Sequence, residues 1–472
     1  MTTNASPADT VDAHPRRWLA LALLGTAQFM LILDVTVVAV ALPQMTIDLG
    51  LSREAVTWVV AAYTLTFGGL MLLGGRSADL FGSKPIVYAG LFAFTAGSLL
   101  AGLAENGTVL LTGRVVQGLG AALLSPAALS VVVRLFTGDE RNRALGIWSA
   151  LGGGGAAVGV LLGGLITAGP GWPWVFFINI PVGLIVLFGL LRVLPPLPPA
   201  PGQRASLDVL GALLVTAATG SAIYALTIAG EDGWTSTHTL IGAGAAVVLY
   251  LLFGWRQKAA ASPLMDLGLL VRRPVGAGVF VIMIATALMV AVFFLGTFYF
   301  QQHAGHGPLA TGLLFLPIAA ATMTGANLGG RLIGRVGARA LGVAGMAFAA
   351  VGLAVPALWP TTVATTVGVS FGAFGIGALF VVASATALGQ IGPEEAGIAS
   401  GLLSTFHEFG ASIGVATVSS LAAVSLAAGG GESGFQQAFG FAAAAAVVAA
   451  VVSLVAIPRP ARPHERAADP HH

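Results

Sequence analysis

Residues 55–104 read AVTWVVAAYTLTFGGLMLLGGRSADLFGSKPIVYAGLFAFTAGSLLAGLA, two long apolar runs around the short charged segment GGRSADLFGSKP (Gly74 to Pro85). An α-helix needs about 20 apolar residues to cross the hydrocarbon core of a bilayer, which is about 30 Å thick. The charged segment is too short to form a soluble domain. The pattern therefore predicts two membrane helices, at 55–74 and 86–104, joined by a tight loop.

The composition of the whole chain agrees with this local pattern. Of the 472 residues, 56% are hydrophobic and only 8% are charged, against about 25% charged in soluble proteins. This excludes a soluble enzyme, a disordered protein and a nucleic-acid-binding protein with a basic face. Cysteine is absent, which excludes disulfides, zinc–thiolate sites and iron–sulfur clusters.

Fourteen segments of the chain have the length and apolarity of membrane helices. They lie at residues 18–42, 55–74, 86–104, 109–133, 144–168, 174–194, 207–229, 238–256, 275–301, 308–330, 340–359, 361–389, 396–427 and 436–457. Single prolines and glycines inside such helices are tolerated. We therefore expect an all-α integral membrane protein with fourteen transmembrane helices.

The distribution of basic residues gives the orientation. If the N-terminus is cytoplasmic, 19 of the 21 Lys and Arg residues fall in cytoplasmic segments, Arg53 is external, and Arg114 lies inside a helix. Cytoplasmic loops of membrane proteins are enriched in these residues. The first apolar run lacks a small-residue cleavage site, so we expect a retained helix rather than a signal peptide. The predicted location is the plasma (inner) membrane, multi-pass, with both termini cytoplasmic.

The sequence partly matches itself at an offset of 255 residues. The match places Gly75-Arg76 on Gly330-Arg331, Gly82 on Gly337 and Lys84 on Arg339. Both copies have the same orientation, so we expect two parallel six-helix bundles with two helices inserted between them, an arrangement typical of transporters. The expected divisions are a cytoplasmic tail (1–17), a first bundle (18–194), a linker with the inserted helices (195–274), a second bundle (275–457) and a cytoplasmic tail (458–472).

Several motifs occur in order along the chain. They are LDVTVVAVALP (Leu33 to Pro43), GGRSADLFGSKP (Gly74 to Pro85), GRVVQGLGAALLSP (Gly113 to Pro126), GGGGAAVGVLLGG (Gly152 to Gly164) and WPWVFFINIPVG (Trp172 to Gly183). Together with the topology, they resemble the major facilitator superfamily, specifically its fourteen-span drug:proton antiporters. The resemblance covers essentially the whole chain and implies the major facilitator fold and multidrug efflux, with a link to antibiotic resistance.

The segment after the second predicted helix is a candidate gating loop. It contains Gly75, Arg76, Asp79, Gly82 and Lys84. A carboxylate there can pair with an arginine or cap a helix N-terminus, and the resemblance implies a cytoplasmic latch. The alternative is that the basic residues only retain the loop inside. The second copy has Gly334 in place of the acid, so a latch would be asymmetric.

Four ionisable residues lie at membrane depth, where such residues are rare and often functional. Two of them are Asp34 and Arg114, about 24 Å and 22 Å from the cytoplasmic side at 1.5 Å per residue. We expect them to share a cavity in the outer half of the first bundle, where Arg114 stabilises ionised Asp34. The resemblance implies a role in proton coupling. The alternative is a static pair that orders the bundle.

The other two ionisable residues are adjacent. Glu408 lies about 18 Å deep, near the midplane, and His407 points about 100° away from it on a helix. Each is a candidate for proton coupling or substrate binding, and only one of them can fully face a central cavity. The alternative for His407 is a hydrogen bond to a neighbouring helix. Many relatives are expected to have Arg and Gln here, so the pair departs from part of the family.

Gly155, Gly159 and Gly163 are spaced four residues apart and predict one smooth helix face that packs against a neighbour. The family's antiporter motif usually has Gly-Pro where this chain has Gly159-Val160. The missing proline removes a kink. The spacing alone predicts the packing role, and the resemblance implies in addition a role against proton leak.

The sequence thus predicts a secondary active transporter that exports small amphipathic organic compounds in exchange for protons by alternating access. We expect no enzymatic activity, no metal and no cofactor, because the sequence shows neither a clustered His/Asp/Glu metal site nor a sizeable soluble domain. The expected energy source is the proton gradient rather than ATP, because no Walker Gly-Lys-Ser/Thr motif is present. The expected partners are the substrate, protons and the lipid bilayer, but no nucleic acid, and the protein is expected to be a monomer. The alternatives are a transporter of a lipid, a peptide or an endogenous natural product, and a non-transport membrane sensor.

Overall fold

The computed structural model describes residues 15–195, 207–260, 263–264, 267–389, 393–426 and 431–458. Over these ranges the chain is helical and contains no strand. Twelve of the described helical segments are long and apolar enough to cross a bilayer. Many large apolar side chains are exposed on them, among them Leu251 and Val455, both 69% exposed. A surface of this kind is suited to lipid, so the predicted all-α membrane class is confirmed.

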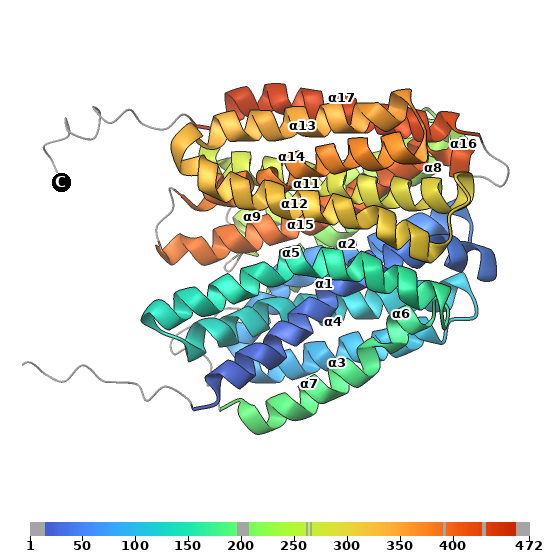
Figure 1. The fold of residues 1–472 in the computed structure, drawn as a ribbon. Coiled ribbons are helices and arrows are strands. Elements are labelled where there is room, and N and C mark those ends of the chain that lie inside the picture. The colour runs from blue at the N-terminus through green and yellow to red at the C-terminus, as the bar shows by residue number, and fades with distance from the viewer. Residues whose placement is uncertain are drawn as a thin grey trace, which may run out of the picture.

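The first group of helices lies in the lower part of Figure 1. Its elements are α1 (Arg17–Asp48), α2 (Arg53–Phe81), α3 (Ser83–Gly102), α4 (Gly107–Leu135), α5 (Gly138–Ala168), α6 (Trp174–Phe177) and α7 (Asn179–Val193). Helix α4 packs against both α2 and α3, and α1 packs against α5 and α7. These contacts bring α1 and α4 together inside the group.

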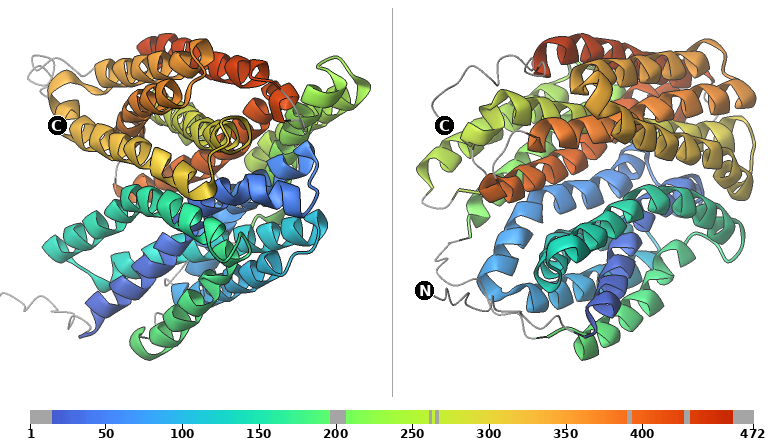
Figure 2. Two further views of the ribbon diagram at one scale, coloured as in Figure 1. Left: turned by 45° about the vertical axis from the view of Figure 1, so that its right-hand side comes forward. Right: turned by 60° about the vertical axis from the view of Figure 1, so that its left-hand side comes forward.

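The second group lies above the first in Figure 1. Its elements are α11 (Arg273–Phe298), the π-helix η1 (Tyr299–His303), α12 (Pro308–Val336), α13 (Ala338–Leu358), α14 (Thr362–Leu388), α15 (Pro393–Leu421), α16 (Ala423–Leu426) and α17 (Ser433–Ala456). The two groups meet where α2 packs against α15 and where α5 packs against α12. Both views in Figure 2 show the groups as separate layers.

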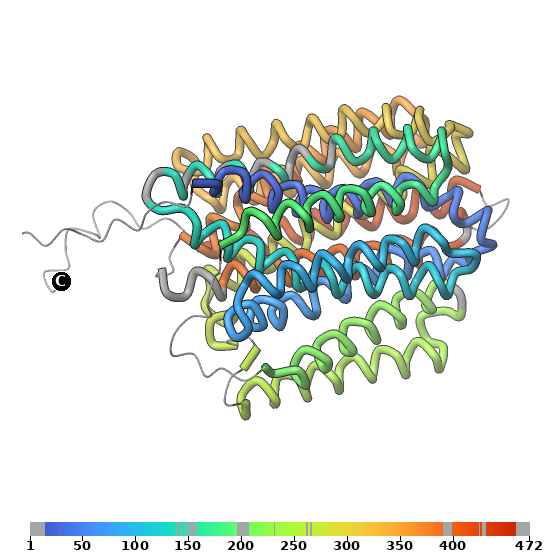
Figure 3. The backbone as a smooth tube through the Cα atoms, turned by 90° about the horizontal axis from the view of Figure 1, so that it is seen from below, coloured from blue at the N-terminus to red at the C-terminus, as the bar shows by residue number. Residues whose placement is uncertain are grey.

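Between the groups in the sequence come α8 (Val209–Asp232), α9 (Thr237–Ala259) and the short α10 (Leu267–Val271). Helices α8 and α9 pack as a pair, which Figure 3 shows along one edge of the bundle. Helix α8 contacts α2 from the first group and α15 from the second. The pair therefore bridges the two groups.

The ends of the bundle are distinct. Helix α1 begins and α17 ends at the left-hand side of Figure 1, and we call this end the terminal face and the opposite end the far face. Helix α2 begins at the far face and ends at the terminal face, because it follows α1 after a short turn.

The 255-residue offset recurs in the helix bounds. Helix α12 begins and ends 255 residues after α2 does. Gly82 and Gly337 follow these helices with φ values of +91° and +81°, a backbone conformation that favours glycine. Next, Lys84 Nζ donates to the carbonyl of Leu194 (2.7 Å) and Arg339 Nε donates to that of Ile457 (2.8 Å). Each cation thus binds the C-terminal end of the last helix of its own group.

The helices differ from the predicted segments mainly in length. The loop motif predicted between 55–74 and 86–104 is mostly helical, because α2 continues to Phe81 and only Gly82 separates it from α3. The prediction of a loop there was wrong. Hydropathy falls at the charged residues, but the helical hydrogen bonds continue beyond the apolar part of the helix. The positive φ of Gly82 then ends α2.

Some predictions fall on residues outside the described ranges. They concern residues 196–206 of the predicted linker, the predicted N-terminal tail up to residue 14, and the predicted C-terminal tail from residue 459. Helices α5 and α15, with 31 and 29 residues, include residues whose side chains lie outside this description, and they are not among the twelve candidate spans.

Candidate functional site

The centre of the first group holds a buried ion pair. Arg114 Nη1 in α4 pairs with Asp34 Oδ2 in α1. The two residues are 1% and 2% exposed. The structure therefore brings together the two ionisable residues that the sequence places at similar depth. They lie in a packed interior rather than in an open cavity.

Glycines allow α3 and α4 to approach closely enough to position the arginine. A Cβ atom on Gly97 would lie 2.6 Å from the backbone nitrogen of Gln117, and one on Gly113 would lie 2.7 Å from that of Ala101. Real Cβ atoms do not approach backbone this closely, so these sites require glycine. The backbone of α4 is thus fixed on both sides of Arg114.

Uncharged polar side chains complete the hydrogen bonds of the pair. Gln117 Nε2 donates to Asp34 Oδ1 (2.9 Å) and to Ser98 Oγ (2.8 Å), and its Oε1 accepts from Arg114 Nη1 (2.9 Å). Asn179 Nδ2 lies 3.4 Å from Asp34 Oδ1. Several hydrogen-bond donors from two other helices, α4 and α7, thus converge on one carboxylate.

The guanidinium of Arg114 is held by further contacts with α2 and α6. Its Nε donates to the carbonyl of Val59 (2.9 Å). Its carbon lies 4.4 Å from the centre of the Tyr63 ring and 5.9 Å from that of Phe176. Cation–π contacts of this kind stabilise a desolvated guanidinium by about 0.5–2 kcal/mol. Arg114 therefore links α1, α2 and α4 through a single charge.

Gln117, Ser98, Asn179 and Tyr63 are not among the residues predicted from the sequence. One usable signal was present, because Gln117 follows Arg114 by three residues and so lies on the same helix face. The others are neutral side chains on different helices, and only the fold brings them to the pair.

Glu408 lies in α15 at the contact between the two groups. It is 9% exposed, and a Cβ atom on Gly68 of α2 would lie 2.6 Å from its Cβ. Among the described residues no side chain makes a hydrogen bond or ion pair with its carboxylate. Glu408 is therefore a buried carboxyl group without a counter-ion in the described part of the chain, facing the first group.

His407 points the other way, into the second group. Its Nδ1 lies 2.9 Å from the Thr286 hydroxyl of α11, and its ring centre lies 5.8 Å from that of Phe380 in α14. The Thr286 hydroxyl also donates to the carbonyl of Ile282. This geometry favours the simpler alternative for His407, a hydrogen bond to a neighbouring helix.

The predicted gating residues lie at the terminal face. Asp79 is exposed near the end of α2 and makes no hydrogen bond or ion pair within the described part of the chain. The close approach of α2 to α4 occurs at Gly74, where a Cβ atom would overlap the carbonyl of Ala122, and not at Gly75, whose Cβ would lie 3.7 Å from Pro126. The close packing of α2 on α4 at this end therefore depends on Gly74, the neighbour of the candidate gating residue Gly75.

The three glycines of α5 pack against α1 around Asp34. A Cβ atom on Gly155 would lie 2.6 Å from Ile32 Cγ2, and one on Gly163 would lie 3.0 Å from Val37 Cα. A Cβ on Gly159 would overlap the hydroxyl of Thr36. The smooth face predicted from the spacing thus seats α5 on the segment of α1 that carries the carboxylate.

At the far face, hydrogen bonds join the two groups. Thr57 bonds Ser419, and deeper in the bundle Thr64 bonds Ser412, each with 2.6 Å between the hydroxyl oxygens. Gln301 Nε2 also donates to the carbonyl of Val40 (2.8 Å). These bonds close the contact between the groups from the far face to mid-bundle.

Arg53, which the sequence analysis placed alone on the external side, adds to this closure. It donates to the carbonyls of Ser419 in α15 (3.2 Å) and Thr227 in α8 (2.6 Å). One residue thus connects the first group, the second group and the α8–α9 pair.

Comparisons with known proteins agree with this architecture. The sequence model of the Major Facilitator Superfamily matches residues 24–415. The chain is 36% identical over 399 residues to the puromycin resistance protein pur8 of Streptomyces alboniger, covering 83% of this chain and 79% of the relative. It is 34% identical over 390 residues to the multidrug resistance protein Stp of Mycobacterium tuberculosis, covering 82% and 72%.

The solved structures that resemble this one share its fold at low sequence identity. One is a POT family transporter in complex with 5-aminolevulinic acid, which has a TM-score of 0.68 and 13% identity over 93% of this chain and 96% of that one. At this identity the likeness extends to the fold alone.

Proposed function

Because the chain belongs to the Major Facilitator Superfamily, we propose that it exports small amphipathic organic compounds, including antibiotics, in exchange for protons. The relatives named for puromycin resistance and multidrug resistance support this substrate class. The observation that carries the proton-coupled mechanism is the buried Asp34–Arg114 pair. A charged pair in the interior of a membrane bundle is costly and marks a proton or ion pathway.

The proposed topology has fourteen spans. Helices α5 and α15 are long enough to add to the twelve candidate spans. In this topology α8 and α9 are the two inserted helices between six-helix bundles. The excess of Lys and Arg on the terminal face supports a cytoplasmic location for both termini and insertion into the inner membrane.

In the proposed coupling step, a proton moves onto Asp34. Ionised Asp34 accepts hydrogen bonds from Arg114 and Gln117. Protonation removes the counter-ion of Arg114, and a buried cation without a partner is strongly destabilised. Arg114 then gains by moving toward another acceptor or toward water, which repacks the helices it contacts. The proton thus biases the equilibrium between two arrangements of the first group.

Glu408 is proposed as a second protonatable side chain. It lies at the contact where the two groups of helices separate and close. As a carboxylate it attracts cationic substrates, and as a neutral acid it fits the apolar contact with Gly68. We assign His407 a structural role through its contact with Thr286. Asp79 is proposed as the latch of the terminal face, which forms an ion pair when the terminal face closes.

The test is export of a panel of amphipathic compounds from cells or into energised inverted vesicles, with and without a proton uncoupler. We expect energised transport that the uncoupler abolishes, while vesicles without the protein show none. Uncoupler-insensitive export would overturn the proton mechanism but retain the transporter. The absence of transport for every compound would favour a sensor or a different cargo.

A further inference from the structure

The segment WPWVFFIN between α5 and α7 has no role in the mechanism proposed above. It runs from Trp172 to Asn179 and contains the short helix α6. Residues at positions i, i+4 and i+7 of a helix share one face, so Trp172, Phe176 and Asn179 lie on one side of the segment. All three are buried, whereas Trp174 and Ile178 on the other side are exposed.

The three buried side chains form a column beside the Asp34–Arg114 pair. Asn179 Nδ2 lies 3.4 Å from Asp34 Oδ1. The ring centre of Phe176 lies 5.9 Å from the guanidinium carbon of Arg114. The Trp172 ring packs edge-on against Phe176, with 6.3 Å between the ring centres. The column therefore connects the buried pair to Trp172.

The Trp172 end of the column lies at the far face. Figure 1 shows α6 toward this face. The indole Nε1 of Trp172 donates to Asp48 Oδ2 (3.0 Å), and Asp48 is the exposed last residue of α1. The column thus lies between the far face and Asp34.

The far face is also the nearer end of the bundle for the pair. Helix α4 begins at the far face, because α3 and α4 continue the alternation of α1 and α2. Arg114 follows the start of α4 by seven residues, which corresponds to about 10 Å at 1.5 Å per residue. A proton that enters from the far face therefore has a short distance to cross, and Phe176 lies on this route.

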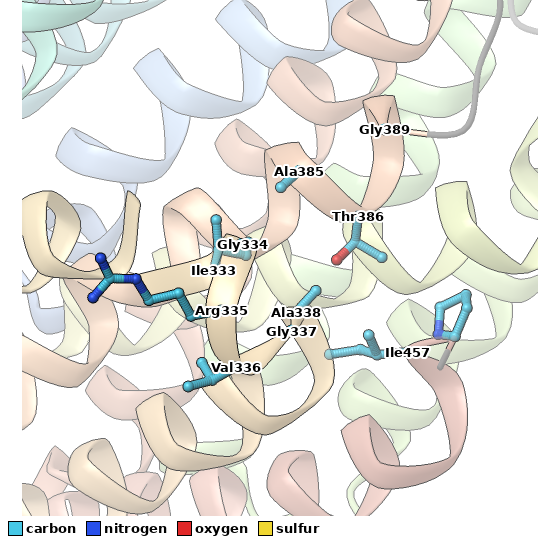
Figure 4. Close-up of a pocket in the computed structure, with 11 residues that line it drawn as sticks. Ile333, Gly334, Arg335, Val336, Gly337, Ala338, Ala385, Thr386, Gly389 and Ile457 are labelled. Carbon is cyan, nitrogen blue, oxygen red and sulfur yellow. The ribbon is translucent and has the colours of Figure 1, made fainter. Parts of the chain in front are cut away.

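Two surface pockets of the described structure do not reach the pair. One, of about 340 Å³, lies at the terminal end of the second group, where Gly334 and Thr386 contribute to its wall (Figure 4). The other, of about 380 Å³, lies between Trp18 of α1 and Leu151 of α5. Neither lining includes a residue that bonds the pair, and the Asp34 side chain is 0% exposed. In this arrangement the carboxylate is shut off from solvent.

The segment also has a point at which it can bend. Pro181 has no N–H, so the carbonyl of Phe177 lacks its usual helical partner four residues later. The helix is interrupted at Ile178, between α6 and α7. Proline sites of this kind let two parts of a helix change their relative angle. Helix α6 can thus tilt while α7 keeps its place.

Contacts of α1 connect this segment to the closure of the far face. Gln301 of the second group donates to the carbonyl of Val40 in α1, and the end of the same helix holds Trp172 through Asp48. When the far face opens, the bond from Gln301 breaks and the end of α1 is released from the second group. The indole bond then transmits a movement of α1 to α6.

We propose that Phe176 is a proton seal, which keeps water from the far face away from Asp34 until α6 tilts on opening of that face. The inference rests on the proposed proton-coupled function, in which protons enter from the far face and leave at the terminal face. If both routes to Asp34 were open in one arrangement, protons would cross without substrate. A buried water needs about two to four polar partners, and the phenyl ring of Phe176 provides none.

The test measures proton flux into proteoliposomes that contain the full chain, with an imposed pH gradient and no substrate. We expect Phe176→Ala to raise the flux several-fold, because the lost benzyl group is larger than a water molecule and the pair supplies polar partners. Phe177→Ala is the matched control. It removes the same side chain from the face that packs against Gly102 of α3 and should leave the flux at the wild-type level. Equal fluxes in the two variants would overturn the proposal.

A size series separates the seal from a loss of folding. Phe176→Leu retains most of the apolar volume and should keep the wild-type flux, while Phe176→Val should give a flux between those of the leucine and alanine variants. Each is compared at equal amounts of monodisperse protein. A flux that does not depend on the size of the side chain would overturn the seal.

The route through the carboxylate is tested by combining Phe176→Ala with Asp34→Asn. The amide does not bind and release a proton, so we expect the flux to return to the wild-type level. A flux that persists in the double variant would show that protons cross elsewhere, and the proposal would be wrong.

A measurement without proton transport distinguishes failure of the seal from failure of the proposed function. Ser98 is buried beside the pair, and Ser98→Cys adds the only thiol of the chain. Thiols react as thiolates, which form where water reaches them. We expect a water-soluble thiol reagent to label this cysteine faster in the Phe176→Val background than in the Phe177→Val background. Equal rates would overturn the seal, whereas unequal rates with uncoupler-insensitive export would overturn only the proton coupling.

Discussion

At the scale of single residues, the Asp34–Arg114 pair costs free energy to bury, and the hydrogen bonds around it offset part of that cost. Removing one partner of a buried ion pair costs about 3–5 kcal/mol, because the other charge remains in a low-dielectric interior. The pair is therefore stable only while both charges are present. This property makes it suited to coupling, because a single proton on Asp34 alters the balance.

The substitution Asp34→Asn mimics the protonated carboxyl group permanently. We expect the variant to reach the membrane, because the many other contacts of α1 remain. Its single amide oxygen can keep the bond from Gln117, which donates to one carboxylate oxygen, but not also the bond from Arg114, which donates to the other. We also expect energised efflux to fall to the level of vesicles without the protein. The assay is uncoupler-sensitive export, with protein amount measured in the same membranes. Wild-type export by this variant would reduce Asp34 to a structural role.

The adjacent residues Glu408 and His407 should respond differently to substitution. We expect Glu408→Gln to lower energised export at least about tenfold, which corresponds to about 1.4 kcal/mol. The reason is that a glutamine side chain at the contact between the two groups of helices cannot change its charge. His407→Gln retains a hydrogen-bonding side chain toward Thr286 and should keep most of the export activity. Export of a cationic and a neutral substrate by each variant provides the measurement. A larger loss in His407→Gln would reverse the assignment.

Ionisable residues at membrane depth could be found from the sequence because charge there is rare. Arg114 and Asp34 were singled out on this ground, and the structure brings them into contact. Ser98, Asn179 and Tyr63 could not be found in this way. Serine, asparagine and tyrosine are tolerated in membrane helices for many reasons, and their meeting at the pair depends on how α3, α7 and α2 pack.

At the scale of helices, glycine positions control how closely elements approach. Gly159→Ala adds a methyl group that would overlap the hydroxyl of Thr36 in α1. We expect it to destabilise the protein by about 1–3 kcal/mol, the usual cost of overpacking. Gly244→Ala in α9 meets no atom within 4 Å and should be neutral or stabilising, since alanine favours helix. Thermal unfolding in detergent compares the two, and equal effects would contradict the packing role.

The contact between α8 and α9 depends on one acid outside the membrane-spanning part of α8. Asp208 accepts from Gly211 N (3.0 Å), Gln257 Nε2 (2.8 Å) and Arg256 Nε (2.9 Å). Burial by itself raises the pKa of Asp208, but these hydrogen bonds outweigh it and hold the pKa below its usual value of 3.8. The ionised acid therefore stabilises the folded state.

A lowered pKa predicts how this stabilisation depends on pH. It is fully present above the unfolded-state pKa, near 3.8, and is lost as the pH falls through the lower folded-state pKa. Asp208→Ala, which removes the helix cap, should cost about 0.5–2 kcal/mol at neutral pH. The difference in melting temperature from the wild type should shrink below about pH 4. A difference that does not change with pH would show that the charge of Asp208 adds nothing.

Helices were located well from the sequence, but their ends were not. Apolar length identified the position of α2, yet the helix continues past Gly74 through Arg76 and Asp79. Hydropathy reports what contacts lipid, whereas the backbone hydrogen bonds of a helix end only where the conformation changes, here at Gly82. Candidate gating residues therefore lie on a helix end, not in a flexible loop.

At the scale of the whole molecule, the repeat was visible in the sequence because glycines and cations persist at one offset. The closure at the far face was not visible. It depends on pairs such as Thr57 with Ser419, which are 362 residues apart and chemically unremarkable on their own. Such contacts form between two rigid groups of helices. The sequence does not specify which of the two arrangements of these groups the chain adopts.

Alternating access requires the far-face contacts to open during transport. Because the chain contains no cysteine, the pair Thr57→Cys with Ser419→Cys can be introduced without removing other thiols. The native hydroxyl oxygens are 2.6 Å apart, so we expect a disulfide to form on oxidation. It would join α2 to α15 and hold the far face closed. Export should stop on oxidation and return with a reductant.

The matched control is Ser83→Cys with Ser130→Cys, whose hydroxyl oxygens are 3.0 Å apart within the first group. This disulfide links α3 to α4, which move together if each group rocks as a rigid body. We expect oxidation to leave export active in the control and to block it in the far-face variant. If both disulfides block export, the groups deform internally. If neither does, substrate leaves without opening the far face, and rigid rocking is wrong.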